Sequence, residues 1–176
     1  MNHIVKHRIT ALFNLTLALF LSFATLPALA DSANQAPQSN PRAIVSENVS
    51  HADFNVTLKT LKEQLSSDGW TLLTEIDLAK RLATKKVIIP GGMVILELTS
   101  GGNTVALLKN EETRYIAGLM PCSVSVYGMS DGRVIISRMN ASLLTSMLEP
   151  KVAEVMGKSA AKLDTSIANA LTKIGK

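Results

Sequence analysis

Residues 116–140, IAGLMPCSVSVYGMSDGRVIISRMN, decide the fold of this chain. Two stretches with the alternating composition of strands, Ser123–Tyr127 and Val134–Met139, lie on either side of Asp131-Gly132. An Asp-Gly pair between such stretches is a strong signal for a tight turn, because glycine readily adopts the positive φ that these turns require. The segment therefore predicts a β-hairpin, and it also contains the only cysteine of the chain.

Residues 1–30 have the three regions of a secretory signal in the expected order. Lys6 and Arg8 give a positive start, and Leu15–Leu26 is an apolar run that is short for a membrane span. Ala28-Leu29-Ala30 then resembles a cleavage site. We expect a signal peptide that is cleaved near Ala30, which places the mature protein in the periplasm or outside the cell. A retained membrane anchor is the alternative.

The mature chain has only a mild positive charge. The signal contains two of the 18 Lys and Arg residues and none of the 14 Asp and Glu residues, so the net charge falls from +4 to +2. Proteins that bind nucleic acid or anionic membranes usually concentrate basic residues on one face or segment. The local clusters Lys80-Arg81 and Lys85-Lys86 are explained by a solvated helix end. We therefore expect no nucleic acid partner, and the charge does not imply an anionic membrane as a partner. After signal removal we expect no stable membrane span.

The remaining chain divides into a short leader and one domain. Residues 31–42, DSANQAPQSNPR, are polar with two prolines, which predicts a flexible leader. In residues 43–176, outside the hairpin, three segments have the composition of strands: Ala43–Val49, Trp70–Ile76 and Met93–Leu98. The last of these is almost continuously apolar, which suits an interior strand. Glu97 is its one exception.

Helical patterns fill the gaps between the strands. An apolar stripe that begins at Phe54 predicts a helix with Asn55 as its cap, and Asp77 is placed to cap a short helix that ends at Ala83. A short helix is expected around Val105–Leu108. Glu149-Pro150 marks the start of a long C-terminal helix, with Gly157 as a candidate interruption. The sum is roughly four strands and three or four helices, a single compact α+β domain whose helices cover an antiparallel or mixed sheet.

Three motifs carry a resemblance to a known family: Thr74-Glu75-Ile76-Asp77, Pro121-Cys122 with the Val-rich strand that follows, and Ser137-Arg138-Met139-Asn140. With these motifs the chain resembles, over roughly Ile44 to Ile174, the small bacterial family catalogued as domain of unknown function 302. The resemblance implies a compact α+β fold that often forms homodimers, and it implies no established reaction. Many similar proteins carry Cys-Asn-Pro where this chain has Thr99-Ser100-Gly101. Thiol chemistry that needs two cysteines therefore cannot be transferred to this chain.

Cys122 has a structural explanation and several functional ones. Strand alternation places it on the same face as Val124 and Val126, where a free thiol commonly packs as a small apolar group. The alternatives are a reactive thiol at the open start of the strand, an intermolecular disulfide, or one ligand of a shared metal or haem site. His51 is the only histidine after the signal, and we expect it to be exposed. We therefore predict no metal site and no cofactor, and Cys122 is a weak catalytic candidate.

The polar residues near the hairpin form the candidate ligand-binding set. Glu97 lies among apolar residues, and a buried carboxylate needs a partner, for which we expect Arg138. Arg138, Met139 and Asn140 lie where the hairpin leaves the sheet, and their side chains could line a pocket beside Pro121. We expect structural pairing of Glu97 in preference to catalysis.

Three functions agree with these observations. The preferred one is an exported, non-catalytic binding or interaction protein with a groove between the hairpin and the C-terminal helices for a small hydrophobic or amphipathic ligand. Whether this protein acts as a monomer or as a homodimer stays open. The second is a thiol-dependent redox accessory protein or enzyme that uses Cys122. The third is a structural envelope protein that associates through its C-terminal helix. The lack of a convincing catalytic set favours a protein that is not an enzyme.

Overall fold

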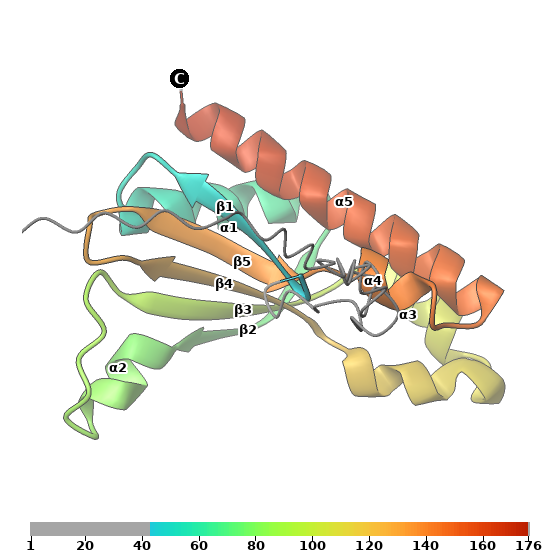
Figure 1. Cartoon of the computed structure of the whole chain (residues 1–176). Helices are drawn as coiled ribbons and strands as arrows, with labels where there is room; N and C mark the ends of the chain where they lie inside the picture. Colours follow the sequence, from blue (N-terminus) through green and yellow to red (C-terminus); the bar gives the residue numbers. More distant parts are fainter. Residues whose placement is uncertain (1–42, 176) are drawn as a thin grey trace, which may run out of the picture. The chain divides into compact units, whose positions relative to one another are not determined.

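The computed structural model describes residues 43–175, so the expected signal peptide and leader lie outside the described residues. The elements along this part of the chain (Figure 1) are β1 (Val45–Ser50), α1 (Phe54–Ser67), β2 (Thr71–Asp77), α2 (Leu78–Ala83), β3 (Met93–Thr99), α3 (Gly101–Leu108), the 3-10 helix η1 (Glu111–Leu119), β4 (Cys122–Gly128), β5 (Val134–Met139), α4 (Ser142–Thr145) and α5 (Pro150–Ile174).

The strands of the described residues form one antiparallel sheet with the order β1-β5-β4-β3-β2. The α+β class and the long C-terminal helix are confirmed. The expectation of roughly four strands is low by one, because all five strand-like segments pair. The interior position of β3, between β4 and β2, agrees with its almost continuous apolar sequence.

The hairpin of β4 and β5 is confirmed by its turn geometry. Gly132 has a φ of +88°, and its N–H donates to the carbonyl of Met129 at 3.0 Å. The N–H of Met129 in turn donates to the carbonyl of Arg133 at 2.7 Å. The carboxylate of Asp131 accepts hydrogen bonds from the backbone N–H and the Nε of Arg133, which fixes the turn.

Helices α1 and α5 cover one face of the sheet (Figure 1). The main core lies between them and the three interior strands, and its buried apolar members include Leu61, Leu65, Val94, Leu96, Leu98, Val124, Val126, Ile136, Leu163 and Ile167. Because strand residues alternate between faces, these side chains also define which face of each strand points to the helices. Cys122 packs against this core, on the face that alternation predicts.

The helix ends test the sequence-based expectations. Asp53 caps α1, because its carboxylate accepts a hydrogen bond from the N–H of Val56 at 2.9 Å. Asn55 lies inside the first turn, so its prediction as the cap was wrong. Asp77 caps α2 as expected, accepting from the N–H of Lys80 at 2.8 Å.

The long helix α5 begins at Pro150, as its sequence predicts, and continues through Gly157 without an interruption. A second small core joins its first turns to α3 and η1, with Leu107, Ile116, Val152 and Met156 buried together. The helices η1 and α4 were not anticipated from the sequence. No helix within residues 43–175 combines the length and apolar character that a bilayer span requires.

Candidate functional site

A groove of about 900 Å³ opens at the end of the sheet where β4 begins and β5 ends. Its walls come from the η1–β4 junction, the β5–α4 segment, the middle of α5, and the neighbouring parts of β2 and β3. The groove thus lies between the hairpin and α5, which is where the sequence predicts a ligand-binding groove. Its lining includes all the candidate residues from the sequence: Glu97, Pro121, Cys122, Arg138, Met139 and Asn140.

The groove exists because the sheet divides at this end. Pairing between β4 and β5 stops at Val124 and Arg138. Beyond that point β4 remains paired with β3 as far as Cys122, while β5 remains paired with β1 as far as Met139. Asn140 extends the contact between β5 and β1 by one residue, because its backbone N–H donates to the carbonyl of Ile44 at 2.8 Å. β4 and β5 therefore separate at this end, and residues of both strands line the groove.

Most of the groove wall is apolar. The η1–β4 junction contributes Leu119, Met120 and Pro121, and α5 contributes Met156 and Leu163. Met156 and Leu163 belong to the packed cores and are each only 6% exposed, so this part of the wall is held in place by the fold. On the strands, Leu73, Ile76 and Met139 extend the apolar surface. A wall of this kind suits an apolar ligand body.

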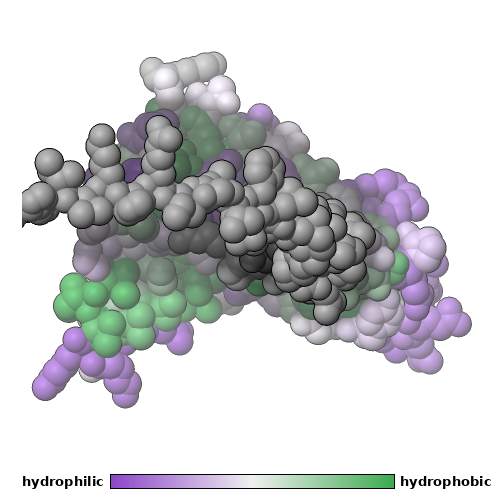
Figure 2. Space-filling model, in the orientation of Figure 1, coloured by the Kyte–Doolittle hydropathy of each residue, from purple (hydrophilic) through white to green (hydrophobic). Residues whose placement is uncertain are grey.

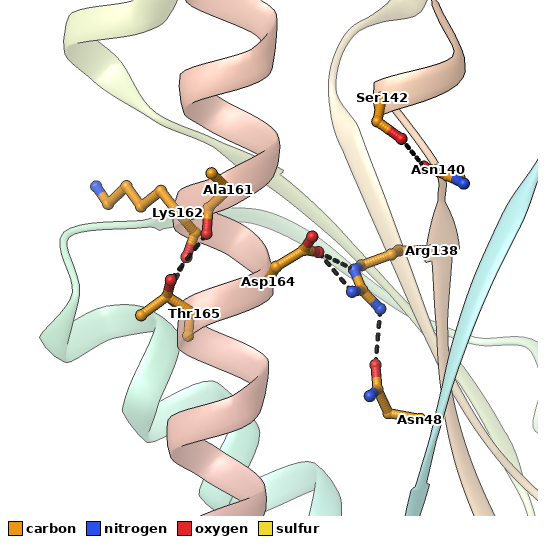
Figure 3. A network of polar contacts seen from close by, with 9 residues as sticks. Asn48, Arg138, Asn140, Ser142, Ala161, Lys162, Asp164 and Thr165 are labelled. Atoms are coloured by element: carbon orange, nitrogen blue, oxygen red, sulfur yellow. Dashed lines mark hydrogen bonds and ion pairs between the residues drawn. The ribbon is translucent and has the colours of Figure 1, made fainter.

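Arg138 is held by a polar network that spans three elements (Figure 3). Its Nε and Nη2 both lie 2.5 Å from Oδ1 of Asp164 on α5, and its Nη1 donates to Oδ1 of Asn48 on β1 at 2.8 Å. The Arg138 side chain is 9% exposed, whereas that of Asp164 is 56% exposed. The network neutralises the guanidinium and connects α5 to β5 and to the edge strand β1 beside the groove.

Glu97 does not pair with Arg138, so that expectation was wrong. In the register, Glu97 lies opposite Ser123, whereas Arg138 lies opposite Val124, which places the two side chains on opposite faces of the sheet. The carboxylate of Glu97 instead accepts from Oγ of Ser123, at 2.9 and 3.0 Å to its two oxygens. None of the ion pairs formed among residues 43–175 involves Glu97.

The charged side chains give the groove a net negative charge. Its lining contains Glu97, Arg138 and Asp164 as charged residues. Because Arg138 and Asp164 neutralise each other, the charge of Glu97 is left uncompensated. The side-chain amide of Asn140 is already hydrogen-bonded within the protein. Its nitrogen donates to the carbonyl of Ala43 at 3.0 Å, and its oxygen accepts from Oγ of Ser142 at 2.5 Å (Figure 3).

Cys122 is half-buried in the groove wall. Burial, and after it the negative charge of Glu97, raise the pKa of the Cys122 thiol, so the thiolate is disfavoured at neutral pH. His51 cannot act as its base. It follows Ser50, which pairs with Val134 at the other end of the sheet, about six residues or roughly 20 Å along β4 from Cys122.

Within residues 43–175 no group of three or more His, Cys, Asp or Glu side chains is placed to hold a metal ion. The sequence reasoning missed Asn48, Ser123 and Asp164 as parts of the site. Ser123 follows from the register of β3 and β4, but Asp164 resembles any exposed acid on a long helix. Asn48 lies in a short edge strand with no distinguishing signal.

Comparison with known proteins gives a family and a fold. The family described as "Domain of unknown function DUF302" matches residues 45–174. The crystal structure of an uncharacterized conserved DUF302 protein from Bacillus stearothermophilus is similar to this chain, with a TM-score of 0.65 and 21% sequence identity. The similarity covers 73% of this chain and 98% of that chain. At that identity the match shows a shared fold. No curated protein matches the chain.

Proposed function

The chain belongs to the DUF302 family, and we propose that it is an exported, non-catalytic binding protein that holds a small hydrophobic or amphipathic ligand in the groove between its hairpin and α5. The family description names no function, so the proposal rests on the groove. Ligand pockets in proteins usually have roughly 300–1,000 Å³, apolar walls and a few polar groups that orient the ligand. A groove of about 900 Å³ with apolar walls and one uncompensated carboxylate meets that description.

The charge of the groove refines the ligand class. An apolar body would contact the wall formed by Met120, Met156 and Leu163. A cationic head, such as a primary amine, would lie near Glu97, because bringing an opposite charge to a half-buried carboxylate is favourable in a partly desolvated site. An anionic head would meet repulsion from the same group. We therefore propose a cationic amphiphile in preference to a fatty acid.

The two alternative functions have less support. A thiol enzyme needs an accessible thiolate, and the raised pKa of Cys122 works against one. Association through the C-terminal helix needs an apolar face that is free, but the stripe of α5 packs inward, with Val152, Leu163 and Ile167 buried. Homodimerisation remains a proposal from the family resemblance. Val45 and Val49 on the edge strand β1 are each 40% exposed, and sedimentation over a range of concentrations would test whether this edge associates.

A filled groove is the sharpest test of the proposed binding. Nile red, a neutral apolar dye, should bind the native protein with a rise in fluorescence and saturate at one dye per chain. Ala160→Trp puts a large side chain into the groove wall and should abolish binding. Ala168→Trp on the exposed side of α5, outside the groove, is the matched control and should leave binding unchanged. Equal binding by both variants would remove the groove as the site.

The natural ligand should be sought in material purified from the exported fraction. Mass spectrometry of small molecules released from the native protein should find a compound that is missing from Ala160→Trp. The exported location is tested in the same preparation, because the amino-terminal sequence of the mature chain should begin near Asp31. Recovery of an uncleaved chain from the cytoplasm would contradict export without bearing on the groove.

A further inference from the structure

Basic and apolar side chains gather at the end of α2 and in the segment that follows it toward β3. We call residues 80–89, KRLATKKVII, the α2–β3 tip. The tip has four basic residues and no acidic one, and all four are exposed. Val87 and Ile88 are 46% and 74% exposed, although both are large apolar residues. Figure 2 shows hydrophobic surface over the segment between α2 and β3, directly beside a strongly hydrophilic area.

The conformation of Lys86 is unusual. The N–H of Lys86 donates to the carbonyl of Ala83 at 3.0 Å, and the N–H of Val87 donates to the carbonyl of Leu82 at 3.2 Å. This is the hydrogen-bond pattern of a Schellman motif, which ends a helix with one residue in the left-handed region. Lys86 occupies that position with a φ of +61°, where glycine is strongly preferred. The backbone of Lys86 is therefore in a conformation that costs free energy for any residue other than glycine. Such strain is commonly found at functional sites.

The other end of the tip is anchored to the sheet. The backbone of Gly91 lies directly against that of Gly128, the last residue of β4, so closely that a Cβ on Gly91 would lie 2.8 Å from the Cα of Gly128. The N–H of Gly128 also donates to the carbonyl of Gly92 at 3.0 Å. A helix end and a backbone contact thus hold the tip on both sides. The backbone of the tip lies at a corner of the domain, beyond the strands (Figure 1).

From this arrangement we propose that the α2–β3 tip docks on the surface of a membrane that contains anionic phospholipid. The lysines would lie at the level of the lipid phosphates, and Val87 and Ile88 would enter the boundary between head groups and acyl chains. Each basic side chain near an anionic surface strengthens binding about fivefold. The mild net charge of the chain does not oppose the proposal, because four basic residues and no acidic residue lie within these ten positions.

The apolar residues distinguish a membrane from a nucleic acid. A phosphate backbone would attract the same lysines but would leave Val87 and Ile88 exposed to water. The tip also contains no aromatic side chain on which a base could stack. A bilayer accommodates both kinds of side chain at once. This inference rests on a surface separate from the groove and is independent of the proposed ligand.

Vesicle sedimentation tests the proposal. The chain beginning at Asp31, which contains the whole described domain, should bind vesicles of phosphatidylcholine with phosphatidylglycerol and should not bind vesicles of phosphatidylcholine alone. Raising the salt concentration should weaken binding, because salt screens the lysines. Ile88→Ser leaves the charge unchanged and should weaken binding about tenfold through lost apolar burial. Equal binding to vesicles with and without phosphatidylglycerol would overturn the proposal. Unchanged vesicle affinity in Ile88→Ser would also overturn it.

Two further comparisons separate the tip from general charge effects. Lys85→Glu should weaken binding strongly, whereas Lys151→Glu, which makes the same charge change in the first turn of α5, should have little effect. Lys86→Gly should weaken vesicle binding about fivefold and yet raise the unfolding temperature, because it removes a charge and relieves the backbone. Equal losses for Lys85→Glu and Lys151→Glu would show a response to net charge alone. Binding to duplex DNA as strong as that to vesicles would also overturn the membrane assignment.

Discussion

Oδ1 of Asp164 lies 2.5 Å from both Nε and Nη2 of Arg138, so one carboxylate oxygen on α5 faces the edge of a guanidinium on β5. The remaining nitrogen of Arg138 donates to Asn48, which extends the connection to the edge strand β1. The contact lies where β4 and β5 separate. It therefore holds the long helix against β5 and β1 at the place where β5 no longer pairs with β4.

Removing the carboxylate should destabilise the protein. Asp164→Ala leaves the Arg138 side chain 9% exposed, with Asn48 as its remaining hydrogen-bond partner among residues 43–175, and we expect the free energy of unfolding to fall by about 1–2 kcal/mol. The value is modest because Asp164 is itself well exposed to water. Urea unfolding followed by circular dichroism measures the change.

The matched control for that variant is another ion pair of α5. Glu154 and Lys158 lie four residues apart with both side chains largely exposed. Glu154→Ala should therefore lower the free energy of unfolding by less than about 0.5 kcal/mol. Equal losses for Glu154→Ala and Asp164→Ala would mean that the Arg138 contact behaves as an ordinary surface pair.

Charge in the groove should select among ligands of equal length. We expect decylamine to displace Nile red more strongly than decanol, and decanoate more weakly than decanol. Glu97→Gln removes the uncompensated charge and should reduce the affinity for decylamine about tenfold while leaving that for decanol unchanged. Glu112→Gln, at an exposed acid outside the groove, serves as the control. If decylamine binding were insensitive to Glu97→Gln, the cationic head would have to be abandoned while the apolar groove remained.

Features that depend on neighbouring residues could be predicted from the sequence. The Asp131-Gly132 turn, the Asp77 cap and the helix start at Pro150 all match the structure. Each is determined within a few residues by backbone preferences or by a local hydrogen bond. The cap of α1 shows the limit of this reasoning, because Asp53 and Asn55 are both good caps and the sequence does not choose between them.

Features that depend on distant pairing could not be predicted in the same way. The pairing register of the strands determines which face of the sheet Glu97 and Arg138 each occupy. A shift of one residue in that register would move a side chain to the opposite face. The partner of Arg138 is instead 26 residues away on α5. The groove itself depends on where β4 and β5 stop pairing, which reflects the separate pairing of each strand with β3 and β1. The sequence therefore indicated six residues of the groove lining but not their contacts.

The thiol of Cys122 should react slowly at neutral pH. Its pKa is raised by burial and by the charge of Glu97, so labelling by iodoacetamide should increase as the pH rises above the ordinary range of a cysteine. Glu97→Gln removes the second cause and should lower the pKa, which makes labelling faster at a given pH. The same cysteine in urea-unfolded protein provides the reference rate. Labelling of native protein as fast as that of the unfolded chain would contradict the raised pKa.

The contact between Gly91 and Gly128 should be intolerant of any side chain. Gly91 has a φ of +75°, and an added Cβ would meet the Cα of Gly128 at 2.8 Å, so Gly91→Ala combines a clash with an unfavourable backbone conformation. We expect a loss of about 2 kcal/mol or more in the free energy of unfolding. Gly102→Ala, at an exposed helical position with nothing within 4 Å of the new Cβ, should be neutral or stabilising.

The same pair of variants connects the anchor to the α2–β3 tip. A tip released from β4 would have to be ordered again on a bilayer, so Gly91→Ala should weaken vesicle binding at temperatures where the protein is still folded. Gly102→Ala should bind vesicles as the unaltered chain does. If Gly91→Ala lowered stability and left vesicle binding intact, the lysines and apolar residues would act without a fixed tip, and the anchor would serve the fold alone.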